Sequence, residues 1–155
     1  MRSSYIIIPL LTVIVALLGK TVVQSCDAWT WYQALQLPGL TPPNWVFPIA
    51  WNIIFICAAL AAIIVWNSFT RNLQFWAIIG LFIANAALNI LWTYLFFGKH
   101  LIAYALFEAI ILELVTIAMM LLIAARSMTI SLLLLPYVAW VLFAIYLNYM
   151  IWMMN

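Results

Sequence analysis

Five long apolar runs constrain this chain more than any other feature. They cover residues 5–23, 45–66, 73–97, 101–125 and 130–154. Each reaches or nearly reaches the roughly 20 residues that a helix needs to cross about 30 Å of hydrocarbon. The runs are apolar on every side, whereas the strands of a membrane barrel alternate apolar and polar residues. We therefore predict an all-α, polytopic membrane protein built as a bundle of five transmembrane helices.

Composition supports a single membrane domain over residues 1–155. The chain is 71% hydrophobic, with five basic and three acidic side chains, which is too few to cover the surface of a water-soluble globule. A net charge of +2 is too small to indicate nucleic-acid binding. Arg2, Arg71 and Arg126 on one side outnumber Lys20 and Lys99 on the other, so we expect the N-terminus inside.

The one long connection, residues 24–44, is rich in tryptophan and proline. It leads through "WYQALQLPGLTPPNWVFPIAW" (residues 31–51) into the second run. Pro38, Pro42 and Pro43 fix the backbone and exclude a continuous helix. Trp31 and Leu35 are spaced as neighbours on a helix surface. We expect a short helical turn on the membrane surface that forms a stiff lid over the bundle.

The first run allows a second interpretation. Its end, "VVQSC", resembles a lipoprotein signal with Cys26 as the modified residue, although Gln24 stands where such signals prefer a small or aliphatic residue. Cys26 should lie in the loop and Cys57 near the middle of the second helix, so we expect no disulfide between them. Pro48 and Pro136 fall inside predicted spans and should kink them, which opens space between helices.

Residues for hydrolytic, nucleotide or metal chemistry are almost absent from the sequence. His100 is the only histidine and stands beside Lys99 in a turn, where an interfacial role is expected. There is no His or Cys pair at ligand spacing, no G-x-S-x-G and no Gly-rich phosphate loop. We predict no metal site and no required cofactor.

Two glutamates lie within the fourth run. Glu108 and Glu113 are five residues apart, about 140° around a helix, so they should not face one cavity together. Glu108 is near enough to the helix start to reach the interface, whereas Glu113 should be neutral or hydrogen-bonded. Structural satisfaction is the simpler interpretation of Glu113, and function is the alternative.

Aromatic and amide residues form stripes at helical spacing on three runs. They are Trp51, Phe55, Ala58 and Ala62; Asn85, Asn89, Trp92 and Phe96; and Trp140, Ala144 and Asn148. Asparagines can also hold helices together, and tryptophans near span ends (Trp45, Trp66, Trp76, Trp152) suit interfacial belts. Trp51, Trp92 and Trp140 lie too deep for a belt. The stripes predict a cavity with flat aromatic walls for a large planar, mostly apolar ligand.

Small residues form another face of the third run. Gly80, Ala84 and Ala87 follow the small-xxx-small pattern that lets helices approach closely. A homodimer seam and packing within one chain are equally good interpretations of this face.

Three motifs together resemble one family. They are "WY..L..P...PP.WVFP..W" in the loop and second run, "NILW" at residues 89–92, and "PY..W...A..LN" at residues 136–148. The chain resembles the TspO/MBR family of tryptophan-rich sensory proteins and translocator proteins, also known as peripheral benzodiazepine receptors. The resemblance covers nearly the whole chain.

The resemblance implies a five-helix bundle, often dimeric, in a bacterial cell membrane. Its implied ligands are porphyrins such as protoporphyrin IX or haem, benzodiazepine-site compounds and, in some members, cholesterol. By motif position, the implied ligand-binding residues are Tyr32, Pro42 and Pro43 in the lid and Trp51, Asn89, Trp92, Trp140, Ala144 and Asn148 in the pocket, and the helical stripe adds Asn85 as a ligand-binding candidate. The resemblance also implies light-dependent porphyrin breakdown in some bacterial members, with Trp51 and Trp140 as the oxidisable residues.

One departure from the family bears on cholesterol. Tyr149 is followed by "MIWMMN" without the basic residue of the cholesterol pattern, so we do not expect cholesterol binding. Three functions remain open: a porphyrin-binding sensor or receptor, a small transporter of planar ligands, and a photochemical enzyme.

Overall fold

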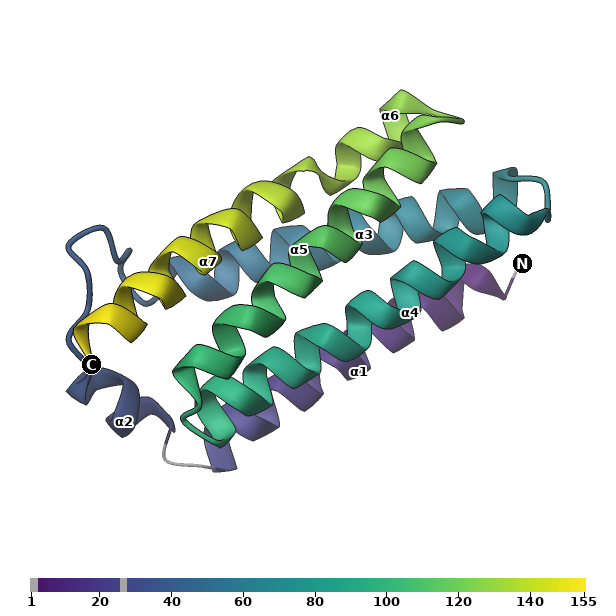
Figure 1. Ribbon diagram of the computed structural model, residues 1–155. Coiled ribbons are helices and arrows are strands. Elements are labelled where there is room, and N and C mark those ends of the chain that lie inside the picture. Colours follow the sequence, from purple (N-terminus) through teal and green to yellow (C-terminus); the bar gives the residue numbers. More distant parts are fainter. Residues whose placement is uncertain (1–2, 26–27) are drawn as a thin grey trace.

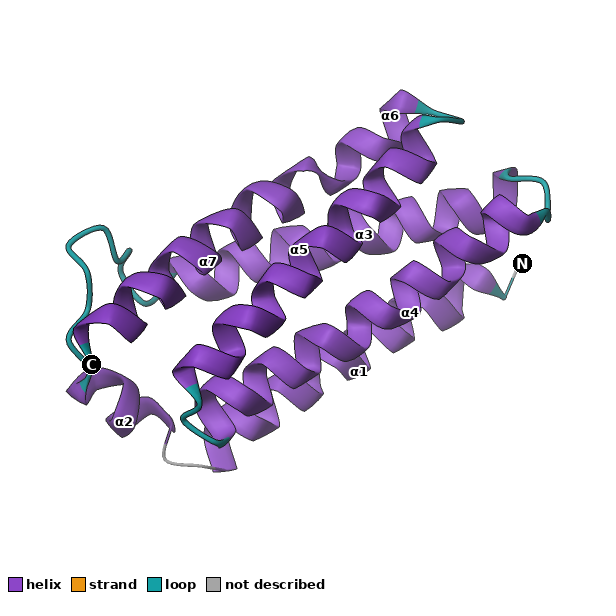
Figure 2. Ribbon diagram, in the orientation of Figure 1, coloured by secondary structure: helices purple, strands orange, loops and turns teal. Residues whose placement is uncertain are grey.

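The computed structural model describes residues 3–25 and 28–155. Within these ranges, five helical segments are long and apolar enough to cross a membrane, at Ser4–Gln24, Val46–Ser68, Leu73–Gly98, Ile102–Ala124 and Met128–Met154. Figure 1 shows them side by side as an elongated bundle, and Figure 2 shows that the described chain consists of helices, short turns and one longer loop before the second span. The predicted all-α, five-helix membrane fold is confirmed.

The described residues form seven α-helices and two short irregular turns. These elements are α1 (Ser4–Ser25), α2 (Ala28–Ala34), α3 (Val46–Ser68), α4 (Leu73–Thr93), the π-helical turn η1 (Tyr94–Gly98), α5 (Ile102–Ala124), α6 (Met128–Ser131), the 3₁₀ turn η2 (Leu132–Leu134) and α7 (Leu135–Met154). The short helix α2 is the predicted surface turn of the loop. It lies at the end of the bundle that also holds the C-terminus (Figure 1).

Short turns make neighbouring spans antiparallel and so define two ends of the bundle. At the lid end, α1, α4 and α7 finish and α3 and α5 begin. At the other end, side-chain caps start the helices: the Asn72 side chain accepts from the N–H of Phe75, and Ser127 accepts from the N–H of Ile130. Such caps satisfy amide groups that have no partner inside the helix.

The end opposite the lid is filled by close packing. Seven side chains there are completely buried against one another: Ala61, Val65, Phe75, Ile78, Met119, Ile123 and Leu134. Arg126 closes this end by donating from Nε to Gln74 Oε1 (2.9 Å) and from Nη1 to Thr70 Oγ1 (2.8 Å). We call this part of the bundle the closed half.

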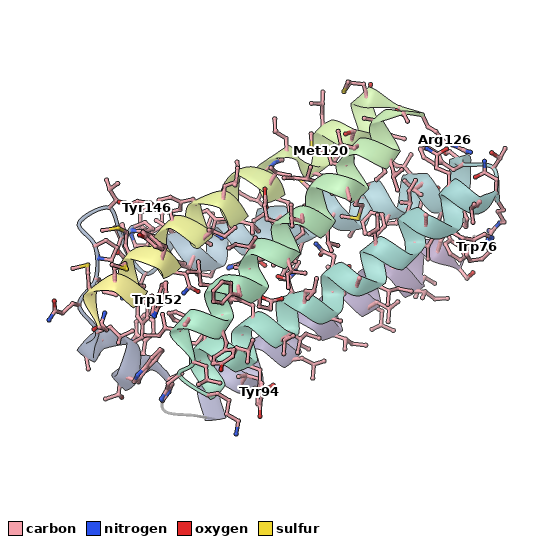
Figure 3. All side chains as sticks on the ribbon, in the orientation of Figure 1. Trp76, Tyr94, Met120, Arg126, Tyr146 and Trp152 are labelled. Carbon is pink, nitrogen blue, oxygen red and sulfur yellow. The ribbon has the colours of Figure 1, made fainter. Side chains whose placement is uncertain are left out.

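Aromatic and charged side chains mark both ends. Figure 3 shows Trp76 and Arg126 at the closed end, and Tyr94 and Trp152 toward the lid end. Trp76 and Trp152 are exposed, which suits the predicted interfacial belts. Arg71 stacks over Trp66, with its guanidinium carbon 4.6 Å from the ring centroid.

The prolines do not act as predicted. Pro48 is the third residue of α3, where the backbone N–H has no partner within the helix, so no hydrogen bond is lost. The predicted kink at Pro48 is therefore wrong. Pro136 stands in the first turn of α7, directly after the 3₁₀ turn η2, so the last span changes helix type there. Cys57 is a free thiol, and Cys26 lies outside the described residues.

Candidate functional site

The lid half of the bundle contains a cavity of about 790 Å³. Residues from α1, α2, α3, α4 with η1, and α7 line it, together with Asn44 just before α3. Its volume is in the range of pockets that bind small organic ligands. We call this part of the bundle the hollow half.

Flat aromatic side chains make up much of the cavity wall. Trp92 and Phe96 are stacked, with ring centroids 5.1 Å apart and planes 11° from parallel. Trp51 and Phe55 on α3 line the same cavity, with their centroids 5.5 Å apart. The predicted aromatic stripes of the second and third spans therefore meet across one space. Aromatic faces of this kind favour stacking with a planar ligand.

The π-helical turn η1 adds a second phenylalanine to the wall. Its wider winding is seen in the hydrogen bond from the N–H of Lys99 to the carbonyl of Tyr94, five residues earlier (2.9 Å). Phe96 and Phe97, adjacent in sequence, both line the cavity. A π-turn of this kind is rare and often marks a functional site. The sequence contained the Phe96 stripe but gave no signal for the turn.

Aromatic contacts dock the lid helix onto η1 and the turn after it. Tyr32 is buried, lines the cavity and lies 6.3 Å from Phe96, measured between ring centroids. Trp31 stacks on His100, with centroids 4.1 Å apart and planes 9° from parallel. This contact supports the interfacial interpretation of His100. Burial raises the pKa of the Tyr32 phenol above its ordinary value, so this hydroxyl stays protonated at neutral pH.

The C-terminal residue fastens the loop that follows α2. The Asn155 side chain accepts from the N–H of Gln36 (2.9 Å) and donates to the carbonyl of Gln36 (3.1 Å). The expected lid prolines lie farther along this loop. Pro42 is half-buried and Pro43 is exposed, and neither is among the residues lining the cavity. Their contribution is therefore to the path of the loop.

Amide groups on α4 and α7 also line the cavity. Asn148 on α7 accepts from the indole N–H of Trp92 (3.2 Å) and donates to the carbonyl of Ile102 (2.9 Å). It thereby joins α4, α5 and α7 beside the aromatic wall. Asn89 and Ala144 also line the cavity. The sequence placed all three on the correct faces.

Asn85 lies one turn deeper than Asn89 and does not line the cavity. Its side chain donates to the Thr116 hydroxyl (2.9 Å) and accepts from the Tyr137 hydroxyl (2.8 Å), and Asn89 donates to the same tyrosine. These four buried residues, which we call the polar belt, join α4, α5 and α7 between the two halves. Asn85 therefore has the helix-joining role that was the simpler alternative to ligand binding.

Trp140 borders a different space. It lines a small pocket of about 40 Å³, whose wall also includes Trp51, Asn89, Trp92 and Ala144. Phe47 packs against it edge-on, with centroids 5.8 Å apart. Trp51 therefore faces both spaces, whereas Trp140 is one layer behind the main cavity.

The two glutamates of α5 are both buried, with 5% of Glu108 and 4% of Glu113 exposed. None of their carboxylate oxygens has a hydrogen-bond partner within residues 3–25 and 28–155. The expectation that Glu108 reaches the interface is wrong, because its part of α5 is covered by neighbouring helices. Glu113 has no hydrogen bond in the described chain, so the hydrogen-bonded alternative is not seen there. Neither glutamate lines the cavity.

Helix α1 supplies a wall of the cavity that sequence reasoning missed. Its lining residues are Val15, Ala16, Leu17, Gly19, Lys20, Val23 and Gln24. The helix is apolar nearly all round, so no stripe distinguished its inner face. Lys20 and Gln24, one turn apart, were the available signal.

The small face of α4 is open at Gly80. Gly80 is exposed, and a Cβ atom added there would meet no heavy atom within 4 Å. Ala87 is also exposed, and Ala84 is half-buried. Of the two interpretations of this face, packing against another helix of the same chain is excluded at Gly80.

Comparison with known proteins assigns the chain to a family. The model of the TspO/MBR family matches residues 6–153. The chain belongs to the TspO/MBR family. The match includes all five spans and the lid, so the family resemblance carried by the three sequence motifs is confirmed.

Relatives within the TspO/MBR family come from distant organisms. Protein CrtK of Rhodobacter capsulatus is 34% identical over 131 residues, covering 81% of this chain and 78% of the relative. The tryptophan-rich protein TspO of Archaeoglobus fulgidus is 37% identical over 127 residues, covering 81% and 80%. The human translocator protein is 30% identical over 128 residues, covering 81% and 75%. The protein is therefore an integral, multi-pass membrane protein of this family.

Proposed function

We propose that the protein is a membrane receptor or sensor that binds a tetrapyrrole of the porphyrin class in the hollow half. The observation that carries this proposal is the cavity of about 790 Å³ with Trp51, Trp92 and Phe96 in its wall. A porphyrin is large, planar and mostly apolar, so its faces suit stacked aromatic walls. Amides such as Asn148 can orient its polar edge.

Protoporphyrin IX is favoured over haem as the ligand. Iron in haem is held by histidine, cysteine, methionine or tyrosine side chains. The described lining residues include no histidine, cysteine or methionine, and the one tyrosine, Tyr32, belongs to the lid helix and has a protonated phenol. A metal-free porphyrin needs no such ligand.

The proposal is tested by a dark titration of the protein in nanodiscs with protoporphyrin IX, following the porphyrin absorption band. Trp51→Ala removes an aromatic side chain of the cavity and should weaken saturable binding by about tenfold, the effect of losing about 1.4 kcal/mol of stacking. Trp140→Ala should weaken binding less, because Trp140 lies behind the wall. Trp76→Ala, exposed at the opposite end, is the matched control and should not change binding.

Absorption that never saturates, or that is identical in all four proteins, would mean that the porphyrin only partitions into lipid. The same samples under illumination address the enzymatic alternative, which requires porphyrin loss that depends on light and on Trp51 or Trp140. Porphyrin flux into sealed liposomes would favour the transporter alternative, since binding alone moves no ligand.

We further propose that the exposed small face of α4 is a homodimer seam. Gly80 leaves room for the backbone of a second helix to approach closely. Gly80→Leu should lower the dimer fraction measured by cross-linking in nanodiscs. Ala139→Leu, which adds the bulk of leucine at an exposed position of α7, is the control that should leave it unchanged.

A further inference from the structure

Lys20 is a charged side chain on the wall of the cavity, one to two turns before the end of α1. Ala16, Lys20 and Gln24 follow one another at intervals of four residues and all line the cavity. This stripe is therefore the inward face of α1. Among the described lining residues, Lys20 is the only one with a full charge.

Contacts on both sides of Lys20 position this face. A Cβ atom added to Gly19 would lie 3.7 Å from Thr93 Oγ1, so α1 runs against α4 at this level. A Cβ atom added to Gly98 would lie 3.3 Å from Val22 Cγ1, so α1 also touches the end of η1. Lys20 lies between these contacts in sequence. The inward direction of its stripe is therefore set by packing.

Lys20 is the one charged group among several polar groups of the described lining. Gln24 and Asn44 lie toward the lid with it, and the amides of Asn52, Asn89 and Asn148 come from α3, α4 and α7. The ammonium offers three N–H donors and no acceptor. The rest of the lining is mostly aromatic and aliphatic. The ligand that matches this lining has an apolar planar body and an anionic, hydrogen-bond-accepting edge that meets Lys20.

We propose that Lys20 is a specificity-determining residue that pairs with a carboxylate on the edge of the planar ligand. This inference rests on the proposed function, because it concerns the same cavity. An ammonium favours a carboxylate over the uncharged ester of the same body through charge-assisted hydrogen bonds. The aromatic walls bind the body of either form, so Lys20 determines which member of the class binds best.

The test compares protoporphyrin IX with its dimethyl ester, which has the same planar body without the two charges. Both are titrated in the dark against the intact protein in nanodiscs of zwitterionic lipid at low salt, with empty nanodiscs as the baseline. The ratio of the two dissociation constants isolates the contribution of the carboxylates. We expect the acid to bind about fivefold more tightly than the ester, as for a partly exposed ion pair.

Three variants assign the effect to Lys20. Lys20→Met keeps the length of the side chain but removes the charge, and should bring the ratio close to one by weakening the acid alone. Lys20→Arg keeps the charge and should keep the preference for the acid. Lys99→Met is the matched control: Lys99 is also at the lid end, with its ammonium 5.4 Å from the Tyr94 ring centroid, but it does not line the cavity. It should leave the ratio unchanged.

The outcomes separate this inference from the proposed function. If both porphyrins bind saturably and Lys20→Met has the same ratio as the unaltered protein, Lys20 does not recognise the carboxylate and the inference is overturned while the porphyrin site stands. If neither porphyrin binds saturably, the proposed function itself fails.

Discussion

The closed half and the hollow half use the same types of residue for opposite purposes. In the closed half, Phe75 and Met119 are completely buried against other side chains. In the hollow half, Trp51 and Phe55 face a cavity of about 790 Å³. The helices α3 and α4 pass through both halves. One helix can therefore stabilise the fold at one end and border a cavity at the other.

Helix α1 covers the cavity of the hollow half, and the polar belt lies between this cavity and the closed half. Of the described side chains of α1, Ser4 alone is buried, so this helix covers the cavity without entering a core. The belt of Asn85, Thr116 and Tyr137, with Asn89, joins α4, α5 and α7 by hydrogen bonds. The bundle can therefore keep its shape at the belt without side chains that fill the cavity beyond it.

The largest effect on the unfolding free energy is expected when one phenylalanine in each half is replaced by alanine. Phe75→Ala leaves a void in the closed half and should cost about 3 kcal/mol of unfolding free energy, because the close packing cannot collapse around it. Phe55→Ala borders space that already exists, so it should cost about 1 kcal/mol or less and instead weaken porphyrin binding. Unfolding in mixed micelles measures the first quantity and titration in nanodiscs the second. Equal losses of stability would mean that the two halves are packed alike.

A smaller effect is expected at the polar belt. Tyr137→Phe removes the hydroxyl that donates to Asn85 and accepts from Asn89, and should cost about 1 kcal/mol of unfolding free energy. Tyr146→Phe on the exposed side of α7 is the matched control and should cost almost nothing. If both variants unfold alike, the belt does not hold the helices together.

The smallest effect is expected at the lid. Asn155→Ala removes both hydrogen bonds to the backbone of Gln36 and should cost a few tenths of a kcal/mol, because these bonds are exposed to solvent. It should also speed porphyrin dissociation, which stopped-flow displacement measures. Gln36→Ala is the control, since Gln36 takes part through its backbone alone. A dissociation rate that does not differ between the two variants would exclude a retaining role for this contact.

The sequence was sufficient for the spans, the surface helix of the lid and the inward faces of α3, α4 and α7. On each of these helices the inward-facing residues recur at helical spacing, as Asn89 and Trp92 do, and lipid-facing residues lie between them. It was insufficient for α1, whose inner and outer faces are both apolar, and for η1, which depends on packing around Phe96 and Phe97. Asn85 and Asn89 share one stripe and both bond Tyr137, but Asn85 also donates to Thr116 and lies one turn deeper, outside the cavity lining.

The two expectations that were wrong, about Glu108 and Pro48, have a related cause. The position of Glu108 near the start of α5 suggested access to the interface, but its side chain is buried, with 5% exposed. The position of Pro48 within an apolar run suggested a kink, but α3 begins only two residues earlier. In both cases hydropathy gave the extent of the run, while the tertiary packing and the true helix boundary determined the local role.

If the hollow half is the ligand site, a side chain that fills its cavity should abolish porphyrin binding. Ala144 on α7 lines both the main cavity and the small pocket, so Ala144→Phe should occupy the space with the fold intact. Ala139→Phe adds the same ring on an exposed position of the same helix. Titration with protoporphyrin IX should lose saturable binding in Ala144→Phe and keep it in Ala139→Phe. Unchanged binding by a folded Ala144→Phe protein would contradict the claim.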